Sequence, residues 1–168
     1  MRILVLGATG DQGAAQVDAA LAAGFDTHAG VRDATTARAK LPSASNLRHV
    51  DFNDAASLRR ALDGIDALFV NFPSSSFNDG VALQRQAADV AGAAREVGTP
   101  LVLFNTSMPL RAHANGHPSH DVRVAMVEAF VAAGVPLVVF NPVVFMGNLL
   151  RGWARPGIVA RGVFEYPH

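Results

Sequence analysis

The chain has 168 residues, half of them hydrophobic and 17% charged, as expected for one globular domain with a sizeable apolar core. Fourteen basic residues balance fourteen acidic ones, so no net charge attracts nucleic acid or an anionic membrane, and the lack of cysteine excludes disulfides and thiolate metal sites. No apolar run approaches the ~20 residues of a membrane-spanning helix. A strand expected from Arg2 leaves no room for a signal peptide, so we expect a cytoplasmic protein.

Short apolar runs alternate with helix-forming stretches along the chain. The runs are nearly continuous rather than alternating with polar residues, which indicates parallel strands buried on both faces. The sequence therefore predicts an α/β fold with a doubly wound parallel sheet, strand order 3-2-1-4-5-6 and a ligand site above the ends of strands one and four. The expected strands are 2–6, 26–31, 47–50, 67–71, 101–105 and 137–140, and the expected helices lie near 12–23, 35–40, 55–62, 81–97 and 122–133.

The first strand runs directly into a glycine-rich turn that a helix follows. Gly7 allows the tight turn, Gly10 lets the backbone approach a phosphate, and Gly13 lets the helix pack close to the sheet. The positive end of the helix then faces the anion. An ordinary turn is the alternative, but the position between strand and helix favours a dinucleotide pyrophosphate loop. It comprises Gly7, Thr9, Gly10, Asp11, Gln12 and Gly13.

Polar residues follow the next three expected strands, where this fold places its ligand. Asp33 has the spacing of a carboxylate that binds the ribose 2′-hydroxyl of NAD, whereas Arg32 would bind the 2′-phosphate of NADP. A solvated charged loop is the plainer alternative. Asp51 can accept the adenine amino group with Phe52 beside the base, unless the two form a surface pair. Residues of the next strand end are expected over the ribose and nicotinamide: Asn71, Phe72 and Pro73, then serines 74–76.

The fifth expected strand ends in hydroxyl residues, and a histidine-rich segment follows. Ser107 can donate a hydrogen bond to a developing alkoxide, or it can simply satisfy loop backbone groups. His113, His117 and His120 lie within eight residues and suggest a zinc site. Because Gly116 and Pro118 interrupt any helix there, the rings need not converge. We expect a solvated loop and no metal site.

Taken together, several motifs resemble the NmrA-like family of atypical short-chain dehydrogenase/reductases. They are the phosphate loop at 7–13, VRD at 31–33, DF at 51–52, FNTS at 104–107, the Gly-Val-Pro at 134–136 and the segment 141–150. The resemblance implies a Rossmann NAD(P)-binding fold. It also implies a basic residue after Val31, so that Arg32 favours NADP(H) over NAD(H), and it adds Asn141 to the expected cofactor residues.

The resemblance also identifies a departure in the acid–base pair. The superfamily carries Tyr-x-x-x-Lys at the start of the helix after strand five, and those positions fall on Ser119 and Arg123. Arginine can bind a ribose but is a poor proton shuttle, which argues against the usual acid–base chemistry. The candidate catalytic residues are Ser107 and Arg123. The single tyrosine, Tyr166, is distant in sequence.

Two functions remain open. The first is an NADPH-dependent oxidoreductase acting on a small carbonyl or quinone-like acceptor. The second is a non-catalytic sensor that binds the dinucleotide and regulates a protein partner. From residue 151 the sequence shows no clear helical or strand period. We therefore expect a dinucleotide-binding domain at 1–150 and the start of a C-terminal segment at 151–168. That segment is a short extension or the beginning of a substrate region that truncation has removed; the usual length of NmrA-like proteins favours truncation.

Overall fold

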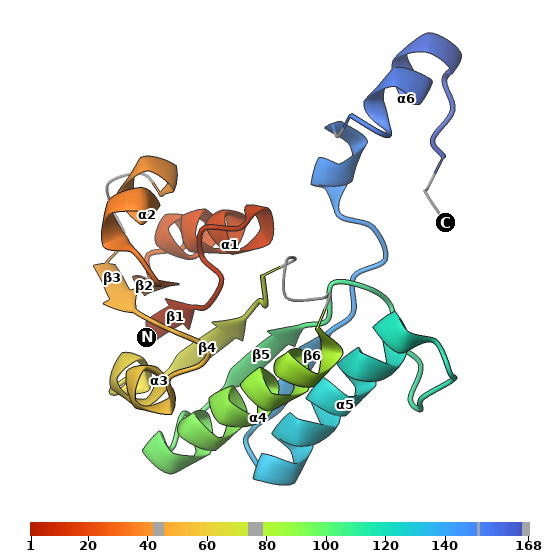
Figure 1. Cartoon of the computed structure of the whole chain (residues 1–168). Coiled ribbons are helices and arrows are strands. Elements are labelled where there is room, and N and C mark those ends of the chain that lie inside the picture. Colours follow the sequence, from red (N-terminus) through yellow and green to blue (C-terminus); the bar gives the residue numbers. More distant parts are fainter. Residues whose placement is uncertain (42–45, 74–78, 151, 166–168) are drawn as a thin grey trace.

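The computed structural model describes residues 1–41, 46–73, 79–150 and 152–165. Over these residues, six parallel strands form one sheet in the order β3-β2-β1-β4-β5-β6, which confirms the predicted doubly wound topology (Figure 1). The strands are β1 (Arg2–Val5), β2 (Asp26–Val31), β3 (Asn46–His49), β4 (Ala67–Val70), β5 (Val102–Asn105) and β6 (Leu137–Phe140). The helices are α1 (Asp11–Ala22), α2 (Ala34–Lys40), α3 (Ala55–Leu62), α4 (Gly80–Val97), α5 (Pro118–Ala133) and α6 (Arg155–Arg161), with the 3-10 helix η2 (Met146–Leu150) before α6.

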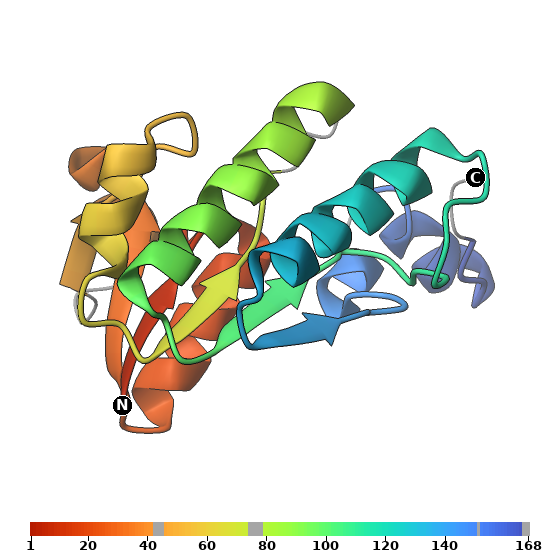
Figure 2. The same ribbon diagram turned by 90° about the horizontal axis from the view of Figure 1, so that it is seen from below.

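Helices cover the sheet in two layers because successive side chains of each strand point to opposite faces. On β1, Leu4 belongs to the apolar core beneath α3, α4 and α5, whereas Ile3 and Val5 belong to the core beneath α1 and α2. Figure 2 shows α4 in green and α5 in teal lying side by side along the first of these faces. Both cores are almost fully buried, and they fix the carboxyl ends of β1 and β4 next to each other.

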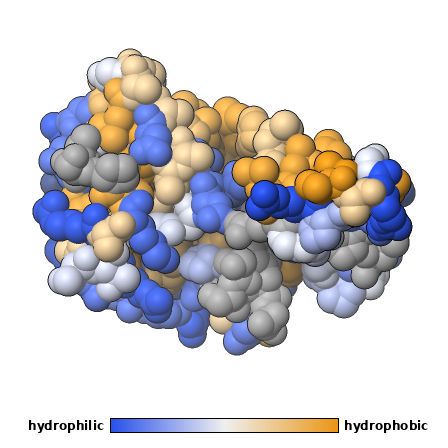
Figure 3. All heavy atoms as spheres, turned by 90° about the horizontal axis from the view of Figure 1, so that it is seen from above, coloured by the Kyte–Doolittle hydropathy of each residue, from blue (hydrophilic) through white to orange (hydrophobic). Residues whose placement is uncertain are grey.

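The outer strand β6 is covered on one face only. Leu137 packs against the core beneath α4 and α5. Val138 and Phe140 are 46% and 60% exposed, since no described helix lies over the other face of this strand. Further exposed apolar residues follow in and around η2, among them Met146 and Leu150. In the space-filling view, apolar surface in orange gathers toward one side of the molecule (Figure 3).

Two predictions about the second half of the chain were wrong. Helix α5 begins at Pro118, not near residue 122, because proline at the first helical position needs no hydrogen-bond partner for its nitrogen. The segment after residue 151 is also not aperiodic throughout. It contains α6, with Pro156 in its first turn and Gly162 in a left-handed conformation (φ +67°) at its end. The boundary at 150/151 stays a prediction, and no helix in the described residues is long and apolar enough to span a membrane.

Candidate cofactor-binding site

The turn between β1 and α1 needs glycine at two positions for reasons within the fold itself. Gly7 has φ +64°, and a Cβ atom there would lie 2.4 Å from the carbonyl oxygen of Asn71. A Cβ atom on Gly13 would lie 2.2 Å from the carbonyl oxygen of Gly7. In both cases the obstacle is backbone, which cannot move aside. Gly7 and Gly13 therefore allow the turn and the close packing of α1 that the sequence predicts.

Gly10 is less constrained, because an added Cβ there meets one backbone atom at a tight distance rather than a severe clash. Its φ is −81°, and the nearest obstacle to an added Cβ is the Gly7 oxygen at 3.3 Å. Gly10 also begins α1 without a side-chain cap, whereas aspartates at 33, 54 and 79 cap the N-termini of α2, α3 and α4. A helix start without a side-chain cap is suited to an external anion such as a pyrophosphate.

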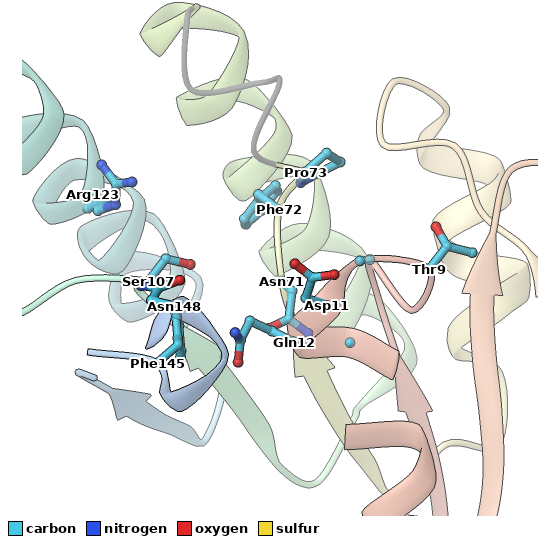
Figure 4. Close-up of a pocket in the computed structure, with 13 residues that line it drawn as sticks. Thr9, Asp11, Gln12, Asn71, Phe72, Pro73, Ser107, Arg123, Phe145 and Asn148 are labelled. Carbon is cyan, nitrogen blue, oxygen red and sulfur yellow. The ribbon is translucent and has the colours of Figure 1, made fainter. Parts of the chain in front are cut away.

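Two adjoining cavities lie above the carboxyl ends of the strands and share Gly7, Thr9 and Pro73. The first has a volume of ≈ 480 Å³ and the second ≈ 280 Å³. Predicted site residues in the first are Gly7, Thr9, Gly10, Asp11, Gln12, Gly13, Asn71, Phe72, Pro73, Ser107 and Arg123 (Figure 4). Predicted residues added by the second are Arg32, Asp51 and Phe52. Among the described residues of the predicted cofactor and catalytic set, Asn141 alone lines neither of these adjoining cavities.

The two candidates for the ribose contact have different surroundings. The Asp33 carboxylate accepts hydrogen bonds from the Thr35 and Thr36 nitrogens at 2.7 and 3.3 Å and from the Thr36 hydroxyl at 2.9 Å. These hydrogen bonds, that of the hydroxyl first, hold the pKa of Asp33 below its usual value. Its oxygens therefore serve to begin α2. Arg32 lines the second cavity, which leaves it the better placed of the two to meet a 2′-phosphate.

The far end of the second cavity is built by the loop after β3. The Asp51 carboxylate accepts a hydrogen bond from the Asn53 backbone nitrogen at 2.9 Å, and the Ser57 hydroxyl accepts one from the Asp51 nitrogen. The Phe52 ring lies 5.1 Å from the ring of Phe72. The Asp51 carboxylate and the Phe52 ring thus both line this cavity, and their contact with an adenine stays a prediction.

A row of amide side chains crosses the sheet beneath the first cavity. Asn71 donates to the Gln16 side-chain oxygen at 2.7 Å and to the Leu6 carbonyl at 3.1 Å. Asn105 in turn donates to Asn71 Oδ1 at 3.1 Å and accepts from the Ser107 nitrogen at 2.9 Å. The last of these bonds supports the left-handed conformation of Ser107 (φ +61°). The row holds Ser107 at the cavity wall, and such strain in a non-glycine residue is common at functional sites.

The histidine-rich segment is a solvated loop at His113 and His117, as predicted, but not at His120. His120 is 5% exposed in the first turn of α5, where its Nε2 accepts from the Arg111 nitrogen at 3.0 Å. Its Nδ1 pairs with Asp121 Oδ1, and the Asp121 carboxylate also accepts from the nitrogens of Asn115 and Gly116. These hydrogen bonds, that with His120 first, lower the pKa of Asp121. His120 and Asp121 thus tie the segment to α5. Among the described residues, no group of three potential ligands gathers to hold a metal ion.

Comparisons with known proteins agree with this architecture. The profile of the NmrA-like family matches residues 1–154. The chain belongs to the NmrA-like family. Phenylcoumaran benzylic ether reductase PT1 from Pinus taeda is 28% identical over an alignment of 173 positions that covers 95% of this chain and 54% of that protein.

Solved structures share the fold of this NmrA-like chain. Triphenylmethane reductase from Citrobacter sp., complexed with NADP(H), superposes with a TM-score of 0.77 at 24% identity, over 94% of this chain and 54% of that chain. The NADPH-dependent quinone oxidoreductase QOR2 from Escherichia coli, complexed with NADPH, gives 0.75 at 23% identity, over 96% and 55%. The chain spans about half the length of the relatives it matches.

The two positions expected to replace the acid–base pair are both engaged in local contacts. Arg123 is 9% exposed, and its Nε donates to the Thr106 carbonyl at 2.8 Å while Nη1 donates to the Ser119 carbonyl. Burial lowers the pKa of its guanidinium, although arginine remains charged at neutral pH. The Ser119 hydroxyl pairs with His117 Nδ1 at 2.9 Å. In the described part of the chain, Arg123 lines the first cavity but Ser119 lines neither.

Some site residues escaped the sequence analysis of this NmrA-like chain, and one expected residue lies elsewhere. Asn141 lines neither described cavity, and its Oδ1 accepts from the Thr106 hydroxyl at 2.9 Å. Phe145 and Asn148 line the first cavity instead; they lie in the segment quoted for the resemblance, which was the available signal. Gln86 and Asn53 line the second cavity without any sequence signal. The serines at 74–76 and Tyr166 lie outside the described residues.

Proposed function

We propose that this chain binds NADP(H) in the groove above β1 and β4 and serves an NADPH-dependent oxidoreductase. The acceptor would be a small carbonyl or quinone-like compound, and the proposal includes a cytoplasmic location. The observation that carries it is the start of α1 at Gly10, which has no side-chain cap hydrogen bond and lines the first cavity. A pyrophosphate in that cavity would accept hydrogen bonds from backbone nitrogens at the start of α1.

The residues of the groove divide into three roles under this proposal. Arg32 holds the 2′-phosphate through paired, charge-assisted hydrogen bonds, and Asp51 and Phe52 hold the adenine. The Gly7–Gly13 turn holds the pyrophosphate. Arg123 binds the nicotinamide ribose, and Ser107 donates a hydrogen bond to the acceptor oxygen as negative charge develops there. When bound, NADPH supplies the hydride, and the chain supplies position and electrostatics.

The names of the relatives support a reductase, but the activity itself belongs to whole proteins of about twice this length. A quinone-like acceptor fits the available residues better than an alcohol, because its reduction depends less on a proton donor or base. Ser119 is paired with His117, and Arg123 donates to two backbone carbonyls. Neither arrangement favours proton transfer to a substrate.

The same observation favours a second candidate, a sensor that binds NADP(H) without turnover and regulates a protein partner. A turnover assay separates the two. NADPH oxidation is followed at 340 nm with a panel of quinones and small aldehydes, alongside a binding titration that uses nicotinamide fluorescence. Binding with quinone reduction supports the oxidoreductase. Binding without turnover across the panel supports the sensor, and absence of binding contradicts both.

A further inference from the structure

Gln86 on α4 carries a buried polar atom that the fold leaves without a partner. The side chain is 8% exposed, and its Nε2 donates to Asn53 Oδ1 at 3.1 Å. Its Oε1 is buried and accepts no hydrogen bond within the described residues. A buried carbonyl oxygen without a donor is destabilising, so such atoms are rare in folded proteins unless a ligand or water satisfies them.

The place of Gln86 suggests which ligand supplies the missing donor. Gln86 lines the second cavity, on the same wall as Asp51, Phe52 and Asn53. This is the end of the groove that the proposed function gives to the cofactor's base. The sequence predicts Asp51 and Phe52 at the adenine, but it gives no reason to expect Gln86 beside them, because Gln86 lies on a helix distant in sequence.

The neighbours of Gln86 fix which end of its carboxamide faces the ligand. Asn53 Oδ1 accepts from Gln86 Nε2 and also from Arg85 Nη2 at 2.9 Å, so two donors converge on that oxygen. The Asn53 nitrogen is itself held by Asp51 at 2.9 Å. Turning the carboxamide over would place its oxygen against Asn53 Oδ1. The nitrogen therefore stays on Asn53, and the oxygen remains as the acceptor. Because that oxygen is buried, binding requires it to turn toward the cavity about the soft terminal torsion of the side chain.

We propose that Gln86 Oε1 accepts a hydrogen bond from the 6-amino group of the cofactor's adenine and so selects adenine over 6-oxo purines. This inference rests on the proposed NADP(H) binding. Gln86 and the Asp51 carboxylate present two acceptors on one wall, and adenine offers an amino donor to such a wall. Hypoxanthine carries a carbonyl oxygen at that position, which would meet Gln86 oxygen against oxygen.

The test compares two cofactors on three proteins. NADPH and deamino-NADPH, which carries hypoxanthine in place of adenine, are titrated against the wild type, Gln86→Met and Gln84→Met by nicotinamide fluorescence. Methionine keeps the unbranched shape of glutamine but cannot accept a strong hydrogen bond. Gln84 lies on the same helix and is exposed, so it receives the same substitution without touching the cavity.

The expected result is a change in the ratio of the two dissociation constants. Wild type and Gln84→Met bind NADPH about tenfold more tightly than deamino-NADPH. The ratio is clearly smaller in Gln86→Met because its NADPH binding has weakened, although Asp51 still favours adenine. Circular dichroism verifies the fold. If Gln86→Met does not fold, Gln86→Asn, which draws the oxygen back by one methylene, is expected to lower the same ratio.

Two results overturn the inference and are distinguishable. A wild-type ratio near one, or an unchanged ratio in a folded Gln86 variant, overturns the role of Gln86 while leaving NADP(H) binding intact. Failure of the wild type to bind either cofactor overturns the proposed function and this inference together.

Discussion

Replacing Gly10 and Gly13 separately by alanine should have different effects: Gly10→Ala should mainly weaken cofactor binding, whereas Gly13→Ala should mainly destabilise the fold. At Gly13 the new methyl group would lie 2.2 Å from the Gly7 oxygen and 2.7 Å from Ala8 Cα, both backbone atoms. Overpacking of this kind costs about 1–3 kcal/mol or more, and the helix preference of alanine offsets at most ~1 kcal/mol. At Gly10 the single close atom is 3.3 Å away. Alanine is a poorer helix start than glycine, so we expect a loss within about 1 kcal/mol.

Thermal unfolding and cofactor titration measure the two effects independently. One kcal/mol shifts Tm by about 2–4 °C in a chain of this size. Gly13→Ala is therefore expected to lower Tm by several degrees, and Gly10→Ala by no more than about 4 °C. NADPH binding is expected to weaken at least about tenfold in Gly10→Ala, because its methyl group stands where a pyrophosphate must approach the backbone.

Two outcomes would refute this reasoning. A Tm loss in Gly10→Ala as large as that in Gly13→Ala would mean that the fold itself requires glycine at both positions. Unchanged NADPH affinity in a folded Gly10→Ala would mean that no phosphate lies against this residue.

Three further predictions concern the cofactor, the chemistry and pH. Arg32→Ala should weaken NADP⁺ binding more than tenfold and leave NAD⁺ binding nearly unchanged, since only NADP⁺ carries the 2′-phosphate; calorimetric titration of both cofactors checks this, and equal losses would contradict it. Alcohol oxidation should be undetectable in the unmodified chain because Arg123 is a poor proton shuttle, and Ser119→Tyr with Arg123→Lys tests whether the pair restores it; robust pH-dependent oxidation without the change would reveal another base. The lowered pKa of Asp121 means that its hydrogen bonds stabilise the fold above the ordinary value of 3.8 and are lost as pH falls through the lower folded value. The Gly116 amide donates to the Asp121 carboxylate, so its chemical shift in NMR spectra recorded against pH reports the protonation of Asp121. The midpoint of that titration should lie below pH 3.8, and a midpoint at or above that value would show no such stabilisation.

The sheet and the phosphate loop were predictable because their signals are local. Each buried strand is a short apolar run, and Gly7, Gly10 and Gly13 stand between a strand and a helix. The strand order then follows from the doubly wound dinucleotide-binding fold that these signals indicate. Arg32 and Asp51, which line the second cavity, were predicted because this fold places ligand contacts directly after its strands.

The features that escaped prediction depend on contacts between distant segments or on an ambiguous residue. Pro118 was interpreted as a helix breaker, but proline is equally suited to the first position of a helix. His120 looks like a solvated residue until the Arg111 nitrogen is seen to donate to it. Gln86 lies in the middle of an ordinary helical stretch, and only the tertiary fold brings it to Asn53. The spacing of these residues in the sequence does not indicate these tertiary contacts.

The half-covered strand β6 affects how this chain behaves in solution. Val138 and Phe140 present apolar side chains along a strand whose outer edge also carries unpaired backbone groups, and β6 is the last strand of the described sheet. An accessible edge of this kind favours pairing between molecules and, at high concentration, aggregation. Affinity measurements on this chain should therefore be made at low protein concentration. Light scattering on the same samples detects self-association, so that it is not mistaken for loss of ligand binding.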